Sequence, residues 1–428
     1  PFKFAPLSKE NKIMKYTGKK FTISVGAMPF ATISNTRSQF RVLANLDKKV
    51  DPEILQKAVD LVVPRFPMYT VIIRRRWHGL RTLQVADMQV KIEPFNPQRE
   101  HYHRYAKKPL FKIMYEDNMI CVELYHILSD GNGGIAFLNC LLACYFTLLG
   151  EEVDMTNILD WRDKAIEEEF EDGYLRFAEN KKGKLNNARS FGRAQFKLQD
   201  KVIRDRGNIS TTYSFDLSAL KRVSKAYGAT LHEYLAAVLC ATFLKLRDEQ
   251  GSKKCIRLQM PIDLRKRFPT STLTNFVATT QFETFGGDKE QLIKDIREHF
   301  AIATNEDELK AFLNDGKTLM HGILGFFPRF ISDFLVDLGD TLLGEKMSNT
   351  SFSNLGLVKN NLTKNGVLTY EVIGGNPMYA PFYVTTISYN GVCNVTFSRH
   401  IESDIFERYF LEELAKDGVT TTKTVIRK

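Results

Sequence analysis

One histidine and one aspartate stand close together at the end of an apolar run, in the stretch VELYHILSDGNGG at residues 122–134. A neutral imidazole can accept a proton from a hydroxyl or an amine near pH 7, as a general base must. His126 is therefore a candidate base, and Asp130 could orient its ring or pair with a distant arginine. The alternative for a lone histidine at a strand end is a structural role.

The glycines that follow, in GNGGIA at 131–136, formally fit the fingerprint of a dinucleotide-binding turn. That fingerprint requires a second strand that ends in an acidic ligand for the ribose. Here an aspartate immediately precedes the glycines, and the charged segment at 160–208 offers no clear strand of that kind. Nucleotide binding is the weaker interpretation.

Other chemical signatures are missing from the sequence. It has no G-x-S-x-G elbow, no phosphate-binding G-x-x-x-x-G-K-[ST] loop and no H-E-x-x-H helix. The 8 histidines are scattered, and the 6 cysteines form no C-x-x-C pair. Cys140 and Cys144 share one face of a predicted helix, where packing is favoured over metal binding. We expect no metal site.

The elements around the histidine predict mixed sheet and helix. Residues 109–128 read as two strands joined at Glu116-Asp117-Asn118, and 51–67 as a helix with Asp51 as its N-cap. The apolar segment 135–150 is shorter than the ~20 residues that cross a bilayer, so it predicts a buried core helix. Near the end of the chain, Asn390-Gly391 indicates a tight hairpin.

The composition is that of a globular protein, and the length allows two or three domains or one large two-lobed unit. The 428 residues are 43% hydrophobic and 26% charged, and the predicted units are 1–180, a connecting segment at 181–208, and 209–428. The net charge of +10 favours an anionic partner such as a phosphorylated cofactor without choosing among anions. The N-terminus has no apolar signal core, so a cytoplasmic location is expected, with no transmembrane segment.

The stretch YHILSDG resembles the H-x-x-x-D-G signature of the chloramphenicol acetyltransferase and condensation-domain superfamily, which includes alcohol acetyltransferases and polyketide-associated acyltransferases. Four further segments are similar to family segments and occur in the same order. They cover roughly residues 37–416 and read LDKKVDPEILQKAVDLVVPRFP, GATLHEYLAAVLCATF, MPIDLRKRFPTSTLTN with its P-x-D-L-R pattern, and SFSNLG with its S-N-x-G pattern.

This resemblance implies an α/β (α+β) fold of two lobes, each a mostly antiparallel sheet flanked by helices, with an active-site tunnel between them. It implies that His126 is the general base and that the acceptor attacks the thioester directly, without an acyl-enzyme. Asp130 and Arg265 would form a supporting ion pair, next to Gly131. The candidates for contacting the oxyanion or substrate lie in the S-N-x-G strand and are Ser351, Ser353 and Asn354.

The resemblance also implies an acyltransferase that moves an acetyl or longer group from acyl-CoA to a hydroxyl, or less readily to an amine. The alternatives are a condensation enzyme that uses a carrier protein in trans, and a non-catalytic family member that binds a ligand. Tyr125 replaces the first histidine of many condensation domains, and the plant D-F-G-W-G motif has no clear counterpart.

The acceptor is expected to be a small-molecule or lipid-like alcohol. The apolar segment 322–344 could line a tunnel for a lipid-like acceptor, although packing between the lobes is the favoured role for it. A monomer that binds no nucleic acid is expected.

Overall fold

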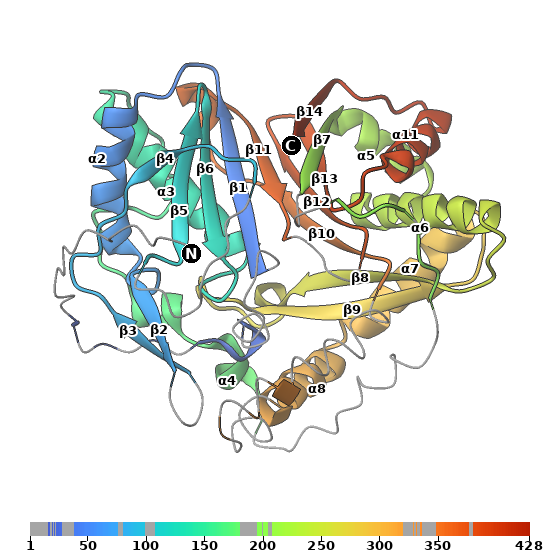
Figure 1. Ribbon diagram of the computed structural model, residues 1–428, viewed down its shortest axis with the longest axis horizontal. Coiled ribbons are helices and arrows are strands. Elements are labelled where there is room, and N and C mark those ends of the chain that lie inside the picture. The colour runs from blue at the N-terminus through green and yellow to red at the C-terminus, as the bar shows by residue number, and fades with distance from the viewer. Residues whose placement is uncertain are drawn as a thin grey trace, which may run out of the picture.

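The computed structural model describes most of the chain. The described ranges are 38–75, 80–98, 108–179, 208–319, 348–375 and 380–428, with short pieces at 16–17, 19, 21, 23–27, 195–198, 200–203, 328, 331 and 334–335. Figure 1 shows two lobes side by side, each built around its own sheet. The predicted connecting segment 181–208 and the apolar segment 322–344 fall largely outside the described residues.

The first lobe contains a five-stranded sheet in the order β11-β1-β6-β5-β4. Helices α2 and α3 pack against each other, and α3 lies on β1 and β6. A separate two-stranded ribbon, β2-β3, lies beside this sheet. The elements are η1 (Val25–Ala27), β1 (Gln39–Leu46), α2 (Pro52–Val62), η3 (Val63–Arg65), β2 (Val71–Arg75), β3 (Leu80–Gln84), β4 (Ile92–Pro94), β5 (Phe111–Glu116), β6 (Met119–Tyr125), α3 (Gly131–Leu148), η4 (Glu167–Phe170), α4 (Gly173–Phe177) and β11 (Val367–Ile373).

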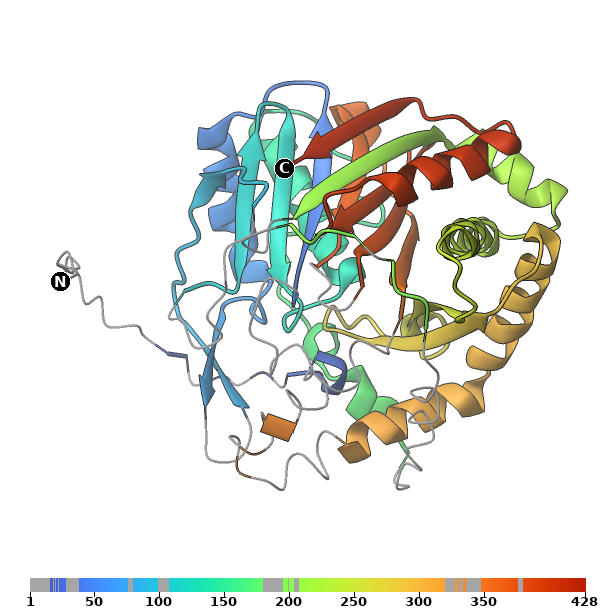
Figure 2. The ribbon, with the colours of Figure 1, turned by 45° about the vertical axis from the view of Figure 1, so that its right-hand side comes forward.

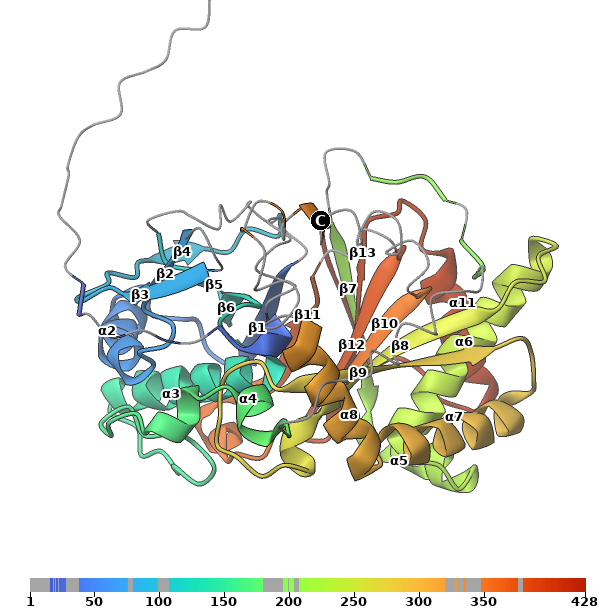
Figure 3. The same cartoon turned by 90° about the horizontal axis from the view of Figure 1, so that it is seen from below.

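The second lobe contains a seven-stranded sheet in the order β14-β7-β13-β12-β10-β8-β9. Its helices gather on one side of the sheet (Figure 3), and Figure 2 views α6 nearly end-on between the sheet and α7. The elements are β7 (Ile209–Asp216), α5 (Leu217–Ala226), α6 (Leu231–Glu249), β8 (Ile256–Asp263), η7 (Leu264–Lys266), β9 (Val277–Thr284), α7 (Lys289–Ala303), α8 (Glu306–Lys317), β10 (Thr350–Leu357), β12 (Phe382–Tyr389), β13 (Val392–Arg399), α11 (Ile405–Lys416) and β14 (Lys423–Arg427). η10 (Leu362–Asn365), which follows β10 in the chain, packs against α3 and β11 of the first lobe, whereas η1 and α4 pack against α8.

Local sequence signals explain several of these elements. Asp51 caps α2 by accepting the N–H groups of Glu53 and Ile54, as its place before a proline predicts. The turn between β12 and β13 is made by Asn390 and Gly391, which both have positive φ (47° and 75°), as a tight hairpin requires. The hairpin of β5 and β6 also follows the prediction.

The two lobes do not follow the predicted boundary along the chain. β11 lies within the range predicted for the second lobe, yet it pairs with β1 of the first lobe, with Arg41 opposite Ile373. It also contacts β12 and β13 of the second sheet. The prediction missed this exchange because a short strand carries no local signal of which sheet it will join. The first lobe is therefore completed by a strand from the last quarter of the chain.

The apolar helix after the glycines is a core element. α3 and the bent pair α5–α6 have the length and composition of a membrane span in the described part of the chain, but most of α3 is buried inside the first lobe. Cys140 and Cys144 are buried on this helix, and burial raises the pKa of their thiols to about 12 and about 11. Protonated, enclosed thiols of this kind pack as small apolar groups.

Candidate active site

His126 lies in the turn directly after β6. The strand ends at Tyr125, and the His126 N–H donates to the carbonyl of Ser38 at 2.6 Å. Its ring packs against Phe40 of β1, with 4.9 Å between the ring centres. Burial lowers the pKa of His126 below its ordinary value, and the nearby charge of Asp130 only partly opposes this shift. The imidazole is therefore neutral near pH 7, in the form that accepts a proton.

Asp130 begins α3 and ties it to the second lobe. One carboxylate oxygen accepts the N–H groups of Asn132 and Gly133 at 3.1 and 3.2 Å, which makes Asp130 the N-cap. The other oxygen accepts the N–H of Phe276 at 3.0 Å and pairs with Arg265 at 2.8 Å. The residue is 1% exposed, so this charge is compensated inside the protein rather than by water.

Arg265 comes from the loop between β8 and β9 and is held by several acceptors. Its guanidinium donates to the carbonyls of Thr272 and Thr274 and pairs with Asp263 at 3.1 Å, besides its contact with Asp130. Burial alone would lower the pKa of Arg265, but the two carboxylates outweigh burial and raise it. The loop of the second lobe is thereby fastened to the turn that carries His126.

The glycines after Asp130 allow close packing of the first turn of α3. A side chain at Gly131 would clash with Leu355 of β10, and one at Gly133 would clash with the carbonyl of Leu273. A side chain at Gly134 would meet β1 and β6. The strand before this helix, β6, is antiparallel to both of its neighbours, whereas a dinucleotide-binding unit needs parallel strands. The glycines therefore serve packing, and the nucleotide interpretation is wrong.

The three candidates in β10 differ in their surroundings. Ser351 and Ser353 lie on one face of the strand, beside the phenol of Tyr383. Burial raises the pKa of Tyr383, and hydrogen bonding to the two serine hydroxyls opposes that rise. The Asn354 side chain accepts the Gly356 N–H at 2.8 Å and so helps to shape the end of the strand. Ser353 is the serine nearer to Leu355, whose side chain lies over Gly131 of the first lobe.

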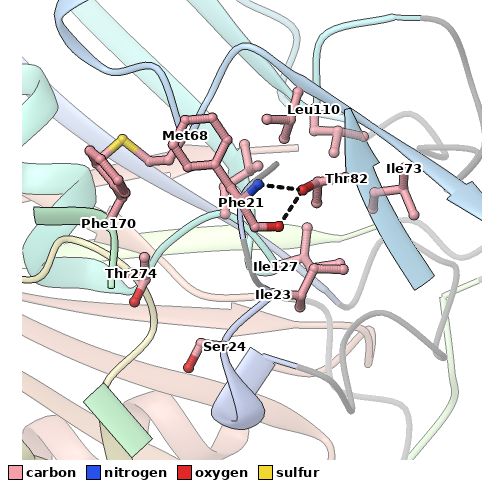
Figure 4. Close-up of a pocket in the computed structure, with 12 residues that line it drawn as sticks. Phe21, Ile23, Ser24, Met68, Ile73, Thr82, Leu110, Ile127, Phe170 and Thr274 are labelled. Atoms are coloured by element: carbon pink, nitrogen blue, oxygen red, sulfur yellow. Dashed lines mark hydrogen bonds between the residues drawn. The ribbon is translucent and has the colours of Figure 1, made fainter. Parts of the chain in front are cut away.

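A small cavity lies behind the His126 turn. Figure 4 shows Ile127 among its lining side chains, together with Phe21, Met68 and Phe170. Its volume is about 20 Å³, enough for a water molecule but not for an acyl group or an acceptor. Substrates therefore have to approach His126 from another side.

Several residues around His126 carry no motif and could not be found from the sequence. Ser129 donates its hydroxyl to the carbonyl of Leu273 at 2.6 Å, which is a second link between the turn and the loop of the second lobe. Ser38, Phe40 and Phe276 contribute backbone groups or packing from distant segments. Asp130 differs from these residues, because it stands just before a helix, where aspartate is a common N-cap.

No histidine, cysteine and carboxylate side chains gather in threes as metal ligands within the described ranges.

Comparison with known proteins places this geometry in a known fold. No family model matches the sequence, and no curated protein matches it. Solved structures do match over nearly the whole chain. Polyketide synthase associated protein 5 from Mycobacterium tuberculosis is 14% identical, with a TM-score of 0.60 over 93% of this chain and 97% of its own. The chain has the two-lobed condensation/acyltransferase fold.

Two other neighbours show the range of this condensation/acyltransferase fold. TRI101 from Fusarium sporotrichioides, solved with coenzyme A and T-2, is 13% identical, with a TM-score of 0.64 over 94% of this chain and 100% of that protein. The first condensation domain of the CDA synthetase is 11% identical, with a TM-score of 0.60 over 94% of this chain and 97% of its own. The fold thus confirms the architecture predicted from the H-x-x-x-D-G resemblance.

Proposed function

We propose that this chain is an acyltransferase that moves an acyl group from a coenzyme A thioester to a hydroxyl acceptor. The observation that carries this proposal is the neutral, half-buried imidazole of His126, held next to an ion pair that joins the two lobes. Structural neighbours with this fold support it, since one is an acetyltransferase by name and another was solved with coenzyme A. The net charge of +10 suits the phosphates of such a donor.

The proposed reaction needs one base and one oxyanion donor. The imidazole of His126 takes the proton of the acceptor hydroxyl while the oxygen attacks the thioester carbonyl. The hydroxyl of Ser353, which lies two residues from Leu355 and its contact with Gly131, donates to the oxyanion of the tetrahedral intermediate. The carbon–sulfur bond then breaks, and the thiolate takes the proton back from the imidazolium. The products are the ester and free coenzyme A, and the enzyme returns to its starting state.

Asp130 and Arg265 act as positioning residues in this scheme. Each oxygen of the carboxylate is already engaged by N–H donors of the backbone or by the guanidinium. Asp130 therefore holds the turn and contributes a nearby charge, while His126 handles the proton.

A direct test is free-thiol release with a panel of acyl-CoA donors and alcohol acceptors. Acceptor-dependent release is expected with at least one pair, and it should be lost in His126→Ala. Release that persists at the wild-type rate in that variant would refute His126 as the base. Binding without turnover in both proteins would instead favour the non-catalytic interpretation.

The second candidate is a condensation-type enzyme that takes its acyl group from a carrier protein. Neighbours from peptide and polyketide synthetases favour it, because they share the fold over nearly the whole chain. The two candidates separate when the same acyl group is offered on coenzyme A and on a carrier protein. Transfer from the carrier alone would replace the coenzyme A proposal.

A further inference from the structure

The sheet of the second lobe has two chemically different faces. One face packs under the helices, and its core residues at one level of the sheet are Leu258, Phe282, Phe352 and Val384. Side chains alternate along a strand, so their neighbours point to the opposite face. At that level the opposite face carries Tyr383, Ser351, Gln259 and Gln281, which we call the polar row.

The polar row is continuous across four adjacent strands. Tyr383 of β12 is the register partner of Ser351 in β10, and Ser351 is the partner of Gln259 in β8. Gln259 lies directly opposite Gln281 in β9. With strands about 4.8 Å apart, the row extends over roughly 14 Å. All four side chains are half-buried, as residues that line a binding surface are.

Charged groups on the same face are already paired. The buried Arg257 guanidinium contacts Glu283 at 2.6 Å, on the side of the row away from the catalytic loop. On the other side, Asp263 pairs with Arg265 at 3.1 Å. The polar row therefore presents amides and hydroxyls between two neutralised charge pairs, which suits a neutral polar ligand better than an anion.

One member of the polar row has an unused buried acceptor. The Oε1 atom of Gln281 is buried and has no hydrogen-bond partner among the residues that the structure describes. An unsatisfied buried oxygen of this kind costs about 1–3 kcal/mol, and a bound donor would remove that cost. A ligand that offers a hydroxyl or an amide N–H at this point would supply it.

The polar row lies within reach of the reaction centre. Leu355 lies four positions after Ser351 in β10, and its side chain lies over Gly131 at the start of α3. The four steps along the strand from Ser351 to Leu355 span about 13 Å. A molecule of roughly ten carbon atoms could therefore extend from the catalytic turn to the polar row.

We propose that the polar row binds a neutral hydroxyl or amide on the acceptor, remote from the hydroxyl that receives the acyl group. This inference rests on the proposed acyl transfer and makes it more specific. The preferred acceptor is then a bifunctional molecule, with one hydroxyl at His126 and a second uncharged polar group at Gln259 and Gln281. A purely apolar alcohol and an acceptor with a distal carboxylate are both disfavoured.

The test uses acetyl-CoA and four acceptors of equal chain length, which are decanol, decane-α,ω-diol, ω-hydroxydecanamide and ω-hydroxydecanoate. In the wild type, kcat/KM for the diol and the hydroxyamide should exceed that for decanol about tenfold, with the carboxylate the poorest. Gln281→Leu and Gln259→Leu should each remove this preference and leave decanol turnover unchanged. Thr279→Val is the matched control, since Thr279 lies on the same face of β9 but outside the polar row.

Several outcomes would overturn the inference. Equal kcat/KM for decanol and the hydroxyamide in the wild type would refute it. An unchanged acceptor preference in both leucine variants, with a higher KM for acetyl-CoA, would assign the row to the amide-bearing arm of the donor instead. A preference lost equally in Thr279→Val would show a general disturbance of β9 rather than recognition.

A binding measurement separates this inference from the proposed function. The melting temperature is measured with decanol and with ω-hydroxydecanamide, in the wild type and in Gln281→Leu. If no acyl transfer occurs but the amide stabilises the wild type more than decanol does, and the variant loses this difference, the polar row stands and the acyl transfer fails. Equal stabilisation by both ligands refutes the polar row whatever the activity.

Discussion

Within the described ranges, two buried ion pairs join the lobes, and they are built differently. Asp130 and Arg265 meet between a turn and a loop, and the pair holds the start of α3. Glu371 of β11 and Arg427 of β14 meet at 2.7 Å between two regular strands, with the Glu371 carboxylate also accepting from Asn45. The Glu371–Arg427 ion pair can only hold the two sheets together. The loop pair also sets the position of His126, four residues away, so only this pair should couple stability to activity.

The largest expected effect belongs to His126→Ala, which tests whether the turn beside the Asp130–Arg265 pair is catalytic or only joins the lobes. Loss of a general base should lower kcat/KM by ~10²–10⁴. The hydrogen bond from His126 to Ser38 is made by the backbone N–H and is kept in the variant, so the melting temperature should stay within a few degrees of wild type. Activity is measured by thiol release and stability by thermal unfolding. Turnover within threefold of wild type would mean that the Asp130–Arg265 pair, like the Glu371–Arg427 pair, only joins the lobes.

The next effect is expected for Asp130→Ala. This change leaves the buried guanidinium of Arg265 with only Asp263 as a carboxylate partner, and it also removes the N-cap of α3. Breaking a buried pair costs about 3–5 kcal/mol, and a lost cap adds about 1 kcal/mol. Chemical denaturation should show this loss, and activity should fall with it at temperatures where the variant is folded. A variant as stable as wild type would mean that the pair contributes nothing.

A smaller loss of stability is expected for Arg427→Met at the strand pair. Asn45 and Thr212 still donate to Glu371 after this change, at 2.8 and 2.7 Å in the wild type. We expect a loss of about 1–3 kcal/mol, with kcat/KM unchanged below the melting transition. Glu371→Gln is the companion variant. A drop in activity as large as that of Asp130→Ala would show that the Glu371–Arg427 pair also positions the catalytic turn.

The smallest effect concerns the pH dependence of activity. Because burial lowers the pKa of His126, kcat/KM should be level at neutral pH and fall only below the ordinary histidine value of 6.5. The charge of Asp130 raises that pKa in part, so Asp130→Asn should move the acidic limb to still lower pH. A pH profile of both proteins checks the direction. A limb that moves toward neutral pH would contradict the assignment.

The sequence predicted the parts of the site that lie in short segments. His126 and Asp130 stand in one stretch, and the resemblance implied the partner Arg265, which the structure places at 2.8 Å from Asp130. The sequence could not predict the contacts of the turn with Ser38 and Leu273, because these depend on how distant segments pack.

The fold was predictable to a similar degree. Alternation, caps and turn residues located the hairpins and the helix at 51–67, and the resemblance implied the two lobes. α3 begins at Gly131, four residues before the predicted start, because the cap on Asp130 and close packing outweigh the poor helix propensity of glycine. The membership of β11 in the first sheet depends on the complete tertiary structure.

The pairing of β1 with β11 has a consequence for how the protein is made. The edge of the first sheet at β1 is closed only after Ile373 has been synthesised and β11 has paired with β1. At about 5–20 residues per second, the ribosome needs on the order of tens of seconds to synthesise the chain between them. During that time one edge of β1 remains without its strand partner and is open to pairing with other chains. We therefore expect chaperones to engage this protein during synthesis, while its first lobe still lacks β11.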